Sequence, residues 1–130
     1  DVYVQSKLSE FKRKFYLEQQ DARFVEQVKI IVGGNLDNPD FDIAAIAKEL
    51  GMSRSAFFKR VKAATGMSPL DFVRDYKLTH AVELLKSSDR SITDVAYCCG
   101  FSDVGYFGKC FRKKYGMSPR AFAVKSRVAT

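Results

Sequence analysis

The sequence contains the same pattern of residues twice. The first copy covers residues 43–72 and the second covers residues 92–122. Its first part recurs at an offset of 49 residues, and after one inserted residue the rest recurs at an offset of 50. The matching residues are Ile43, Ala47, Gly51, Ser53, Phe57, Lys59, Lys62, Gly66, Met67, Ser68, Pro69 and Phe72, against Ile92, Ala96, Gly100, Ser102, Phe107, Lys109, Arg112, Gly116, Met117, Ser118, Pro119 and Phe122. Two like modules on one short chain suggest a repetitive target that is contacted twice.

Each copy has the pattern of a short helix, a glycine turn and a longer helix. In the first copy Asp42 caps a helix over residues 43–50, Gly51 ends it with a positive φ, and Ser53 caps a helix over residues 54–65. The second copy repeats this order with Ser91, residues 92–99, Gly100, Ser102 and residues 103–115. The order is typical of the helix-turn-helix unit, in which the second helix enters the major groove of DNA.

Three further helices complete the prediction. Asp21 caps a helix over residues 21–32, Ser68-Pro69 opens one that continues to about Lys86, and Ser118-Pro119 opens a last one over residues 120–126. No stretch has a β-strand pattern of useful length. The sequence therefore predicts an all-α chain of seven helices. It forms two homeodomain-like helix-turn-helix subdomains, over residues 21–67 and 89–130, joined by a connecting helix over residues 68–88.

Residues 1–20 are polar, and we expect them to be a linker from an upstream domain. The chain begins with Asp1 rather than Met, which favours a piece of a longer protein. An alternative comes from the basic cluster Lys12-Arg13-Lys14, which could form an extra arm that contacts phosphates.

The basic residues are concentrated in the second half of each repeat. The formal net charge is +7 at pH 7, and residues 91–130 supply +5 of it. The stretches 53–70 and 104–130 hold four and seven Lys or Arg residues, respectively, and no acid. A positive surface on both longer helices favours an anionic partner, and double-stranded DNA suits two like modules.

Helical spacing gives each longer helix an inward and an outward face. Phe57 and Phe107 begin the inward faces, and each is followed four residues later by another apolar residue. The outward faces carry the candidate DNA contacts, with bases expected near the helix start and phosphates further along. These candidates are Arg54, Ser55, Phe58, Lys59 and Lys62 in the first copy and Asp103, Gly105, Tyr106, Lys109, Arg112 and Lys113 in the second, with Val104 expected on the same face.

Two stretches resemble the DNA-binding domain of the AraC/XylS family of bacterial transcription regulators. They are IAAIAKELGMSRSAFFKRVKAATGMSP and ITDVAYCCGFSDVGYFGKCFRKKYGMSP, and the second resembles the family signature through Gly-Phe-Ser-Asp, Tyr-Phe and Gly-Met-Ser-Pro. The likeness covers about residues 22–125. It implies two helix-turn-helix subdomains bridged by one long helix, with recognition helices about 34 Å apart, which is one turn of DNA.

The resemblance also implies roles for single residues and for partners. The family's base-contacting places fall on Ser55, Phe58, Lys59, Gly105, Tyr106 and Lys109. Two of these depart from the usual pattern. Phe58 either contacts thymine methyl groups or belongs to the core. Gly105 either permits close approach of the backbone or leaves the second module to bind mostly phosphates. A receiver or sensor domain often precedes this unit, so the resemblance implies a two-component or hybrid-kinase regulator that activates transcription, with RNA polymerase as a further partner.

The sequence disfavours several other kinds of protein. The chain has an odd number of cysteines: Cys98, Cys99 and Cys110. We expect reduced thiols that fill core space in a cytoplasmic protein, with redox sensing as the alternative for the adjacent pair. A single histidine, His80, and no Cys-x-x-Cys predict no metal site and no cofactor. We expect no membrane contact. Without a nucleophile–base pair we expect no enzyme. Two alternatives stay open: a nonspecific, architectural DNA-binding protein, and a basic module that binds an acidic protein.

Overall fold

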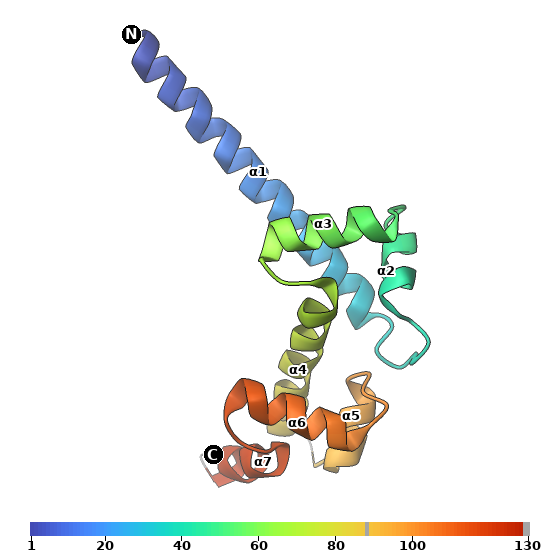
Figure 1. Cartoon of the computed structure of the whole chain (residues 1–130). Helices are drawn as coiled ribbons and strands as arrows, with labels where there is room; N and C mark the ends of the chain where they lie inside the picture. Colours follow the sequence, from blue (N-terminus) through green and yellow to red (C-terminus); the bar gives the residue numbers. More distant parts are fainter. Residues whose placement is uncertain (88, 129–130) are drawn as a thin grey trace.

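A computed structural model describes residues 1–87 and 89–128, and within these ranges the chain folds into seven α-helices and no strand (Figure 1). The predicted all-α class is therefore confirmed. The helices are α1 (Val2–Gly33), α2 (Ile43–Glu49), α3 (Arg54–Thr65), α4 (Pro69–Ser87), α5 (Ile92–Cys98), α6 (Val104–Tyr115) and α7 (Pro119–Val128). The pairs α2–α3 and α5–α6 lie at opposite ends of α4 (Figure 1).

Most helix starts follow the predicted capping chemistry. The side chains of Asp42, Ser53 and Ser91 accept hydrogen bonds from backbone N–H groups in the first turns of α2, α3 and α5. The start of α6 differs, because Asp103 rather than Ser102 is its N-cap. A carboxylate at this position satisfies the first-turn donors and also interacts favourably with the positive end of the helix dipole. The helix therefore begins one residue later than expected.

The first helix is much longer than predicted. α1 begins at Val2 and continues without a break to Gly33, so the expected polar linker is a helix and Asp21 is not an N-cap. The stretch contains no proline and no glycine before Gly33, and it holds many Lys, Gln and Glu residues, which favour helix. Residues 1–19 are all exposed and extend away from the other helices (Figure 1). Polarity alone misled the prediction, since nothing in the stretch stops a helix.

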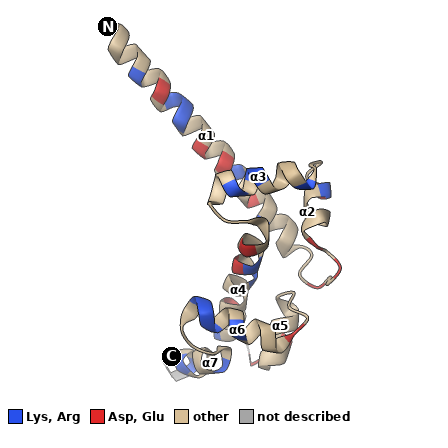
Figure 2. Ribbon diagram, in the orientation of Figure 1, with Lys and Arg blue, Asp and Glu red and all other residues tan. Residues whose placement is uncertain are grey.

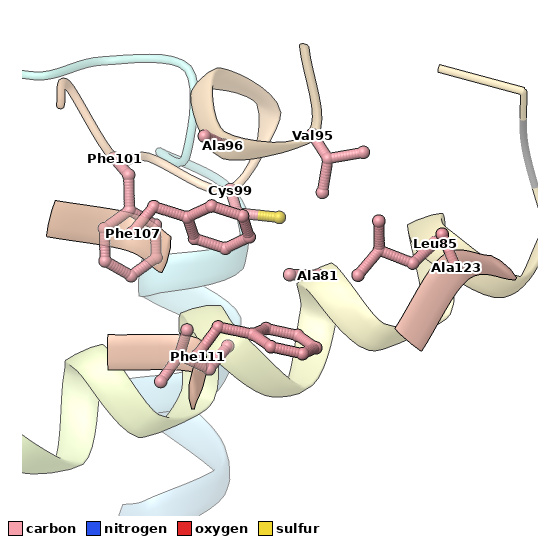
Figure 3. Packing of buried hydrophobic residues seen from close by; sticks show 10 residues of the cluster. Ala81, Leu85, Val95, Ala96, Cys99, Phe101, Phe107, Phe111 and Ala123 are labelled. Atoms are coloured by element: carbon pink, nitrogen blue, oxygen red, sulfur yellow. The ribbon is translucent and has the colours of Figure 1, made fainter. Parts of the chain in front are cut away.

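Two hydrophobic clusters hold the helices together, and α4 contributes to both. Because Val73 belongs to the first cluster and Leu78 to the second, each helix pair needs α4 to complete its core. The first cluster contains Phe24, Val28, Val32, Leu36, Ile46, Ala47, Phe57, Val61 and Val73. The second contains Leu78, Ala81, Leu85, Val95, Ala96, Cys99, Phe101, Phe107, Phe111 and Ala123 (Figure 3).

Buried aromatic rings fix the inner faces of α3 and α6. Phe57, Phe107 and Phe111 have no exposed surface, as their spacing predicted. The rings of Phe107 and Phe111 lie 5.9 Å apart and point from α6 towards the α4–α5 core (Figure 3). Truncation of a buried Phe to Ala typically costs about 3–5 kcal/mol. Because these rings turn one face of α3 and of α6 into the core, the opposite face of each helix points to solvent.

The loop between α1 and α2 contacts the second helix pair directly. Leu36 and Pro39 line one side of a small cavity of about 260 Å³, and Tyr97 and Gly100 line the other. Gly100 has a φ of +85°, and a Cβ atom there would lie 3.1 Å from the backbone oxygen of Leu36. The turn glycine is therefore also the point at which the two halves approach each other.

Candidate nucleic-acid interface

The outward face of α3 exposes all five residues that the sequence proposes for it. Arg54, Ser55, Lys59 and Lys62 are exposed, because Phe57 and Val61 turn the opposite side of the helix into the core. Phe58 is 50% exposed, so its alternative assignment to the core is wrong. An exposed aromatic ring on a basic helix is a suitable contact for thymine methyl groups.

Arg60 belongs to the structure of the first unit rather than to its outer surface. Its guanidinium group forms an ion pair with the carboxylate of Asp21 in α1. The same group lies 4.7 Å from the centre of the Phe24 ring, in the geometry of a cation–π contact. Arg60 therefore ties α3 to α1, whereas the adjacent Lys59 points to solvent.

The outward face of α6 presents the second set of candidates. Asp103, Gly105, Tyr106, Lys109, Arg112 and Lys113 are all exposed. Val104 differs from the expectation, since it is partly buried against the second core cluster. The Asp103 carboxylate accepts a hydrogen bond of 3.1 Å from the Tyr106 N–H, so this side chain is engaged in capping.

Tyr106 is held by a residue of the connecting helix that the sequence analysis did not identify. Arg74 of α4 donates a hydrogen bond of 3.2 Å from Nη1 to the Tyr106 hydroxyl. The ring of Tyr106 lies 6.2 Å from that of Phe101. The hydrogen bond to Tyr106 raises the pKa of Arg74, which is charged at any physiological pH in either case. No spacing rule links residues 74 and 106, because the contact depends on how α4 and α6 cross.

Basic residues lie on both longer helices, α3 and α6, as the sequence indicates. Figure 2 shows Lys and Arg on α3, α6 and α7, and also along α1, where they are mixed with acidic residues. Acidic residues also lie on α4 and near α2 and α5 (Figure 2). The arrangement gives two positive surfaces, at the two ends of α4, that an extended polyanion could contact together.

The cysteines are free, and their surroundings favour packing over reactivity for one of them. Cys99 is fully buried, and burial raises the pKa of its thiol to about 12. Cys98 is half-buried and its sulfur accepts a hydrogen bond of 2.8 Å from Arg90. Burial also lowers the pKa of the nearby Lys77, whose Nζ donates to the Gly100 carbonyl oxygen at 3.4 Å. Cys99 is thus a packing residue.

The described residues offer neither a metal-binding cluster nor a membrane-spanning helix. Within residues 1–87 and 89–128, no group of three or more His, Cys, Asp or Glu side chains is placed to hold a metal ion. Among the same residues, no helix has both the length and the hydropathy needed to cross a membrane.

Two helix-turn-helix units with exposed basic second helices, joined by one helix, define a DNA-binding protein of the helix-turn-helix class. A family described as "Helix-turn-helix domain" matches residues 46–124, which is most of the chain. The chain therefore belongs to this family, which is that of the AraC/XylS regulators. The resemblance of the two repeats to AraC/XylS regulators is therefore confirmed.

Known relatives agree with this assignment. The chain is 34% identical over 102 residues to histidine kinase P4 of Formosa agariphila, covering 78% of this chain and 7% of the kinase. It is 37% identical over 76 residues to the transcriptional activator RhaS of Escherichia coli, covering 58% of this chain and 27% of RhaS. The DNA-binding domain of AdpA, solved with a target DNA, superposes with a TM-score of 0.74 at 30% identity, over 81% of this chain and 94% of that one. The chain thus spans a small part of its curated relatives.

Proposed function

We propose that this chain binds two neighbouring sites in the major groove of double-stranded DNA and thereby regulates transcription. The observation that carries the proposal is the placement of α3 and α6, two exposed basic helices, at the two ends of one connecting helix. Two recognition helices on one rigid frame can enter successive major grooves on one face of the duplex. Successive major grooves on one face of the duplex are one turn, or ~34 Å, apart, so a single chain would cover about 15–20 base pairs.

The exposed residues divide by their position along each recognition helix. Those near the start of the helix are placed for base edges, and those further along are placed for phosphates. The base contacts are Ser55, Phe58 and Lys59 in α3 and Gly105, Tyr106 and Lys109 in α6. The phosphate contacts are Lys62 in the first unit and Arg112 and Lys113 in the second. Arg54, the first residue of α3, is a further DNA contact that position alone does not assign to bases or phosphates, and Asp103 sets the start of α6.

The wider protein is proposed to be a transcription activator controlled by an upstream domain. RhaS is named as an activator, and histidine kinase P4 carries a similar segment within a much longer chain. A receiver or sensor domain ahead of residues 21–67 fits the kinase relative, and we propose RNA polymerase as the partner in activation and the cytoplasm as the place of action. We assign the chain no catalytic role.

Selection from a random pool tests the proposal directly. Duplexes of about 25 base pairs would be bound at near-physiological salt, recovered and sequenced. The expected result is a motif of two short elements separated by about one turn of DNA. Binding without enrichment would instead favour an architectural DNA-binding protein. No binding even at low salt would contradict a DNA target and favour a protein partner.

A matched pair of variants assigns the two elements of the motif to the two units. Lys59→Ala alters the outward face of α3, and Lys109→Ala makes the corresponding change in α6. Each variant is expected to relax base preference in a different element of the motif. If both variants weaken binding equally on every sequence, these lysines contact phosphates and the bases are contacted by other residues.

A further inference from the structure

A cleft separates the first half of α4 from one edge of α6. Its volume is about 530 Å³. The α4 side carries Asp71, Arg74, Asp75 and Leu78, which share one helical face by their spacing of three and four. The α6 side includes Tyr106, Cys110 and Lys114, which follow one another at intervals of four. An edge of α4 and an edge of α6 thus face each other across the cleft.

One polar bridge crosses the cleft at the start of α6. The Tyr106 hydroxyl accepts a hydrogen bond of 3.2 Å from Nη1 of Arg74. Nη2 of the same guanidinium lies 2.6 Å from an oxygen of the Asp71 carboxylate. Asp71 therefore holds Arg74, and Arg74 in turn holds Tyr106. Because the guanidinium is planar, its two bonds fix the direction in which it presents a donor to Tyr106.

A second polar bridge crosses near the end of α6. The Lys114 ammonium lies 2.7 Å from a carboxylate oxygen of Asp75. It also donates to the Asp75 carbonyl oxygen and to the Thr79 hydroxyl, both at 3.3 Å. Lys114 is thus bound to α4, unlike its neighbour Lys113, which is the candidate for a phosphate contact. The two bridges begin at adjacent residues of α4 and end eight residues apart on α6.

The bridges supply what the hydrophobic core does not. Phe107 and Phe111 hold the inner face of α6 through apolar contacts, which are not directional. Hydrogen bonds weaken steeply when the donor angle departs from linear, so bridges at both ends of one edge resist rotation and tilt of the helix. The outward face of α6, including Lys109, turns with that edge. The orientation of the second recognition helix therefore depends on side chains of α4.

We propose that Arg74 and Asp75 of the connecting helix are positioning residues that set the orientation of α6, and with it the base preference of the second half-site. The inference rests on the proposed function, because it concerns how the second DNA-contacting helix is presented. A competing role for Arg74 is direct contact with a phosphate, since it lies beside the same surface. The two roles predict opposite effects of Asp71→Asn on DNA binding, because Asp71 holds Arg74 in place.

The first test measures base preference by selection with Arg74→Leu, Tyr106→Phe and Asp71→Asn. All three are expected to lower discrimination in the second element of the motif by roughly tenfold and to leave the first element unchanged. Arg74→Leu and Tyr106→Phe together should have about the effect of either alone, because they break one bridge. Lys86→Leu is the matched control, since it removes a cation from α4 outside the cleft.

A direct phosphate contact by Arg74 predicts a different set of results. Arg74→Leu would then weaken binding on all sequences and reduce the slope of log affinity against log salt by about 1. Asp71→Asn would strengthen binding, since it frees the guanidinium. Either of these results overturns the positioning role.

A measurement without DNA separates this inference from the proposed function. Amide hydrogen exchange of the free protein is expected to rise in α6 for Arg74→Leu and for Asp75→Asn, while α3 stays unchanged. Melting temperatures identify any variant that has lost its fold, and Arg74→Lys, which keeps a donor, is expected to restore part of the protection. If exchange changes as expected but no duplex is bound, the proposed function fails and the positioning of α6 stands. If exchange in α6 is unchanged in both variants, the positioning role is wrong.

Discussion

The guanidinium group of Arg60 in α3 is bound to the carboxylate of Asp21 in α1, 39 residues earlier in the chain. The same group stacks on Phe24, one turn further along α1. Lys59, the adjacent cation, is exposed. The two neighbouring basic residues therefore differ in role: Arg60 binds α3 to α1 within the first unit, and Lys59 is free to contact a partner.

Arg60→Ala is expected to lower the free energy of unfolding by about 1 kcal/mol. The ion pair is partly exposed, with side-chain exposures of 31% for Arg60 and 37% for Asp21, so solvent screens it. Loss of the cation–π contact with Phe24 adds to the effect. Denaturant unfolding measures the change. The slope of DNA affinity against salt should stay as it is, and a smaller slope would show that Arg60 contacts a phosphate.

Lys59→Ala is expected to leave stability unchanged and to weaken specific DNA binding by about 1–3 kcal/mol. The reason is that Lys59 lies on the outward face of α3, where no core contact depends on it. Titration of the selected duplex and of duplexes altered at single base pairs measures the effect. Preference at one base step should relax, and a uniform loss over all sequences would count against base contact.

Gly100→Ala is expected to destabilise the protein by about 2–3 kcal/mol. A side chain disfavours the left-handed conformation by about 1–2 kcal/mol, and the added Cβ would also lie 3.1 Å from the Leu36 oxygen. Gly51→Ala is the matched control, because Gly51 also has a positive φ but has open space around it. Thermal unfolding compares the two. Equal losses would show that the contact with the α1–α2 loop contributes nothing.

Stability is expected to fall at alkaline pH because of Cys99. Burial raises the pKa of its thiol from 9.0 to about 12. Between these values the unfolded chain has lost the thiol proton and the folded chain keeps it, so the unfolded state binds fewer protons and stability decreases as pH rises. The free energy of unfolding falls by roughly 1.4 kcal/mol per pH unit in this range. Cys99→Ala should be less stable at neutral pH but should lose less between pH 9 and 12, and parallel curves would contradict the assignment.

Deletion of residues 1–15 is expected to change the free energy of unfolding by less than about 0.5 kcal/mol, the usual range for surface changes. These residues are exposed along their whole length, and the first buried residue of α1 is Phe24. The shortened helix keeps Asp21 and its partner Arg60. Far-ultraviolet circular dichroism should lose helix signal while the unfolding midpoint stays constant. A loss of more than about 1 kcal/mol would mean that the exposed helix stabilises the units beyond it.

Local signals in the sequence were sufficient for most of the fold. The capping residues Asp42, Ser53 and Ser91, and the positive φ of Gly51 and Gly100, depend on interactions within a few residues, so spacing predicts them. The same holds for the core positions Phe57 and Phe107, which follow the helical period. The length of α1 was missed because a helix with little apolar pattern has no periodic signal, although it also has nothing to stop it.

The two helix-turn-helix units, their family and the exposed basic faces of α3 and α6 can all be inferred from sequence alone, because short-range spacing sets which side of a helix turns inward. Which cations are bound to another helix depends on how the helices pack against each other. Arg60, Arg74 and Lys114 look like any other basic residues in the sequence, yet each is bound to an acid or a hydroxyl on a neighbouring helix. Such partners lie 32 to 39 residues away and meet only where helices cross, so no local pattern encodes them.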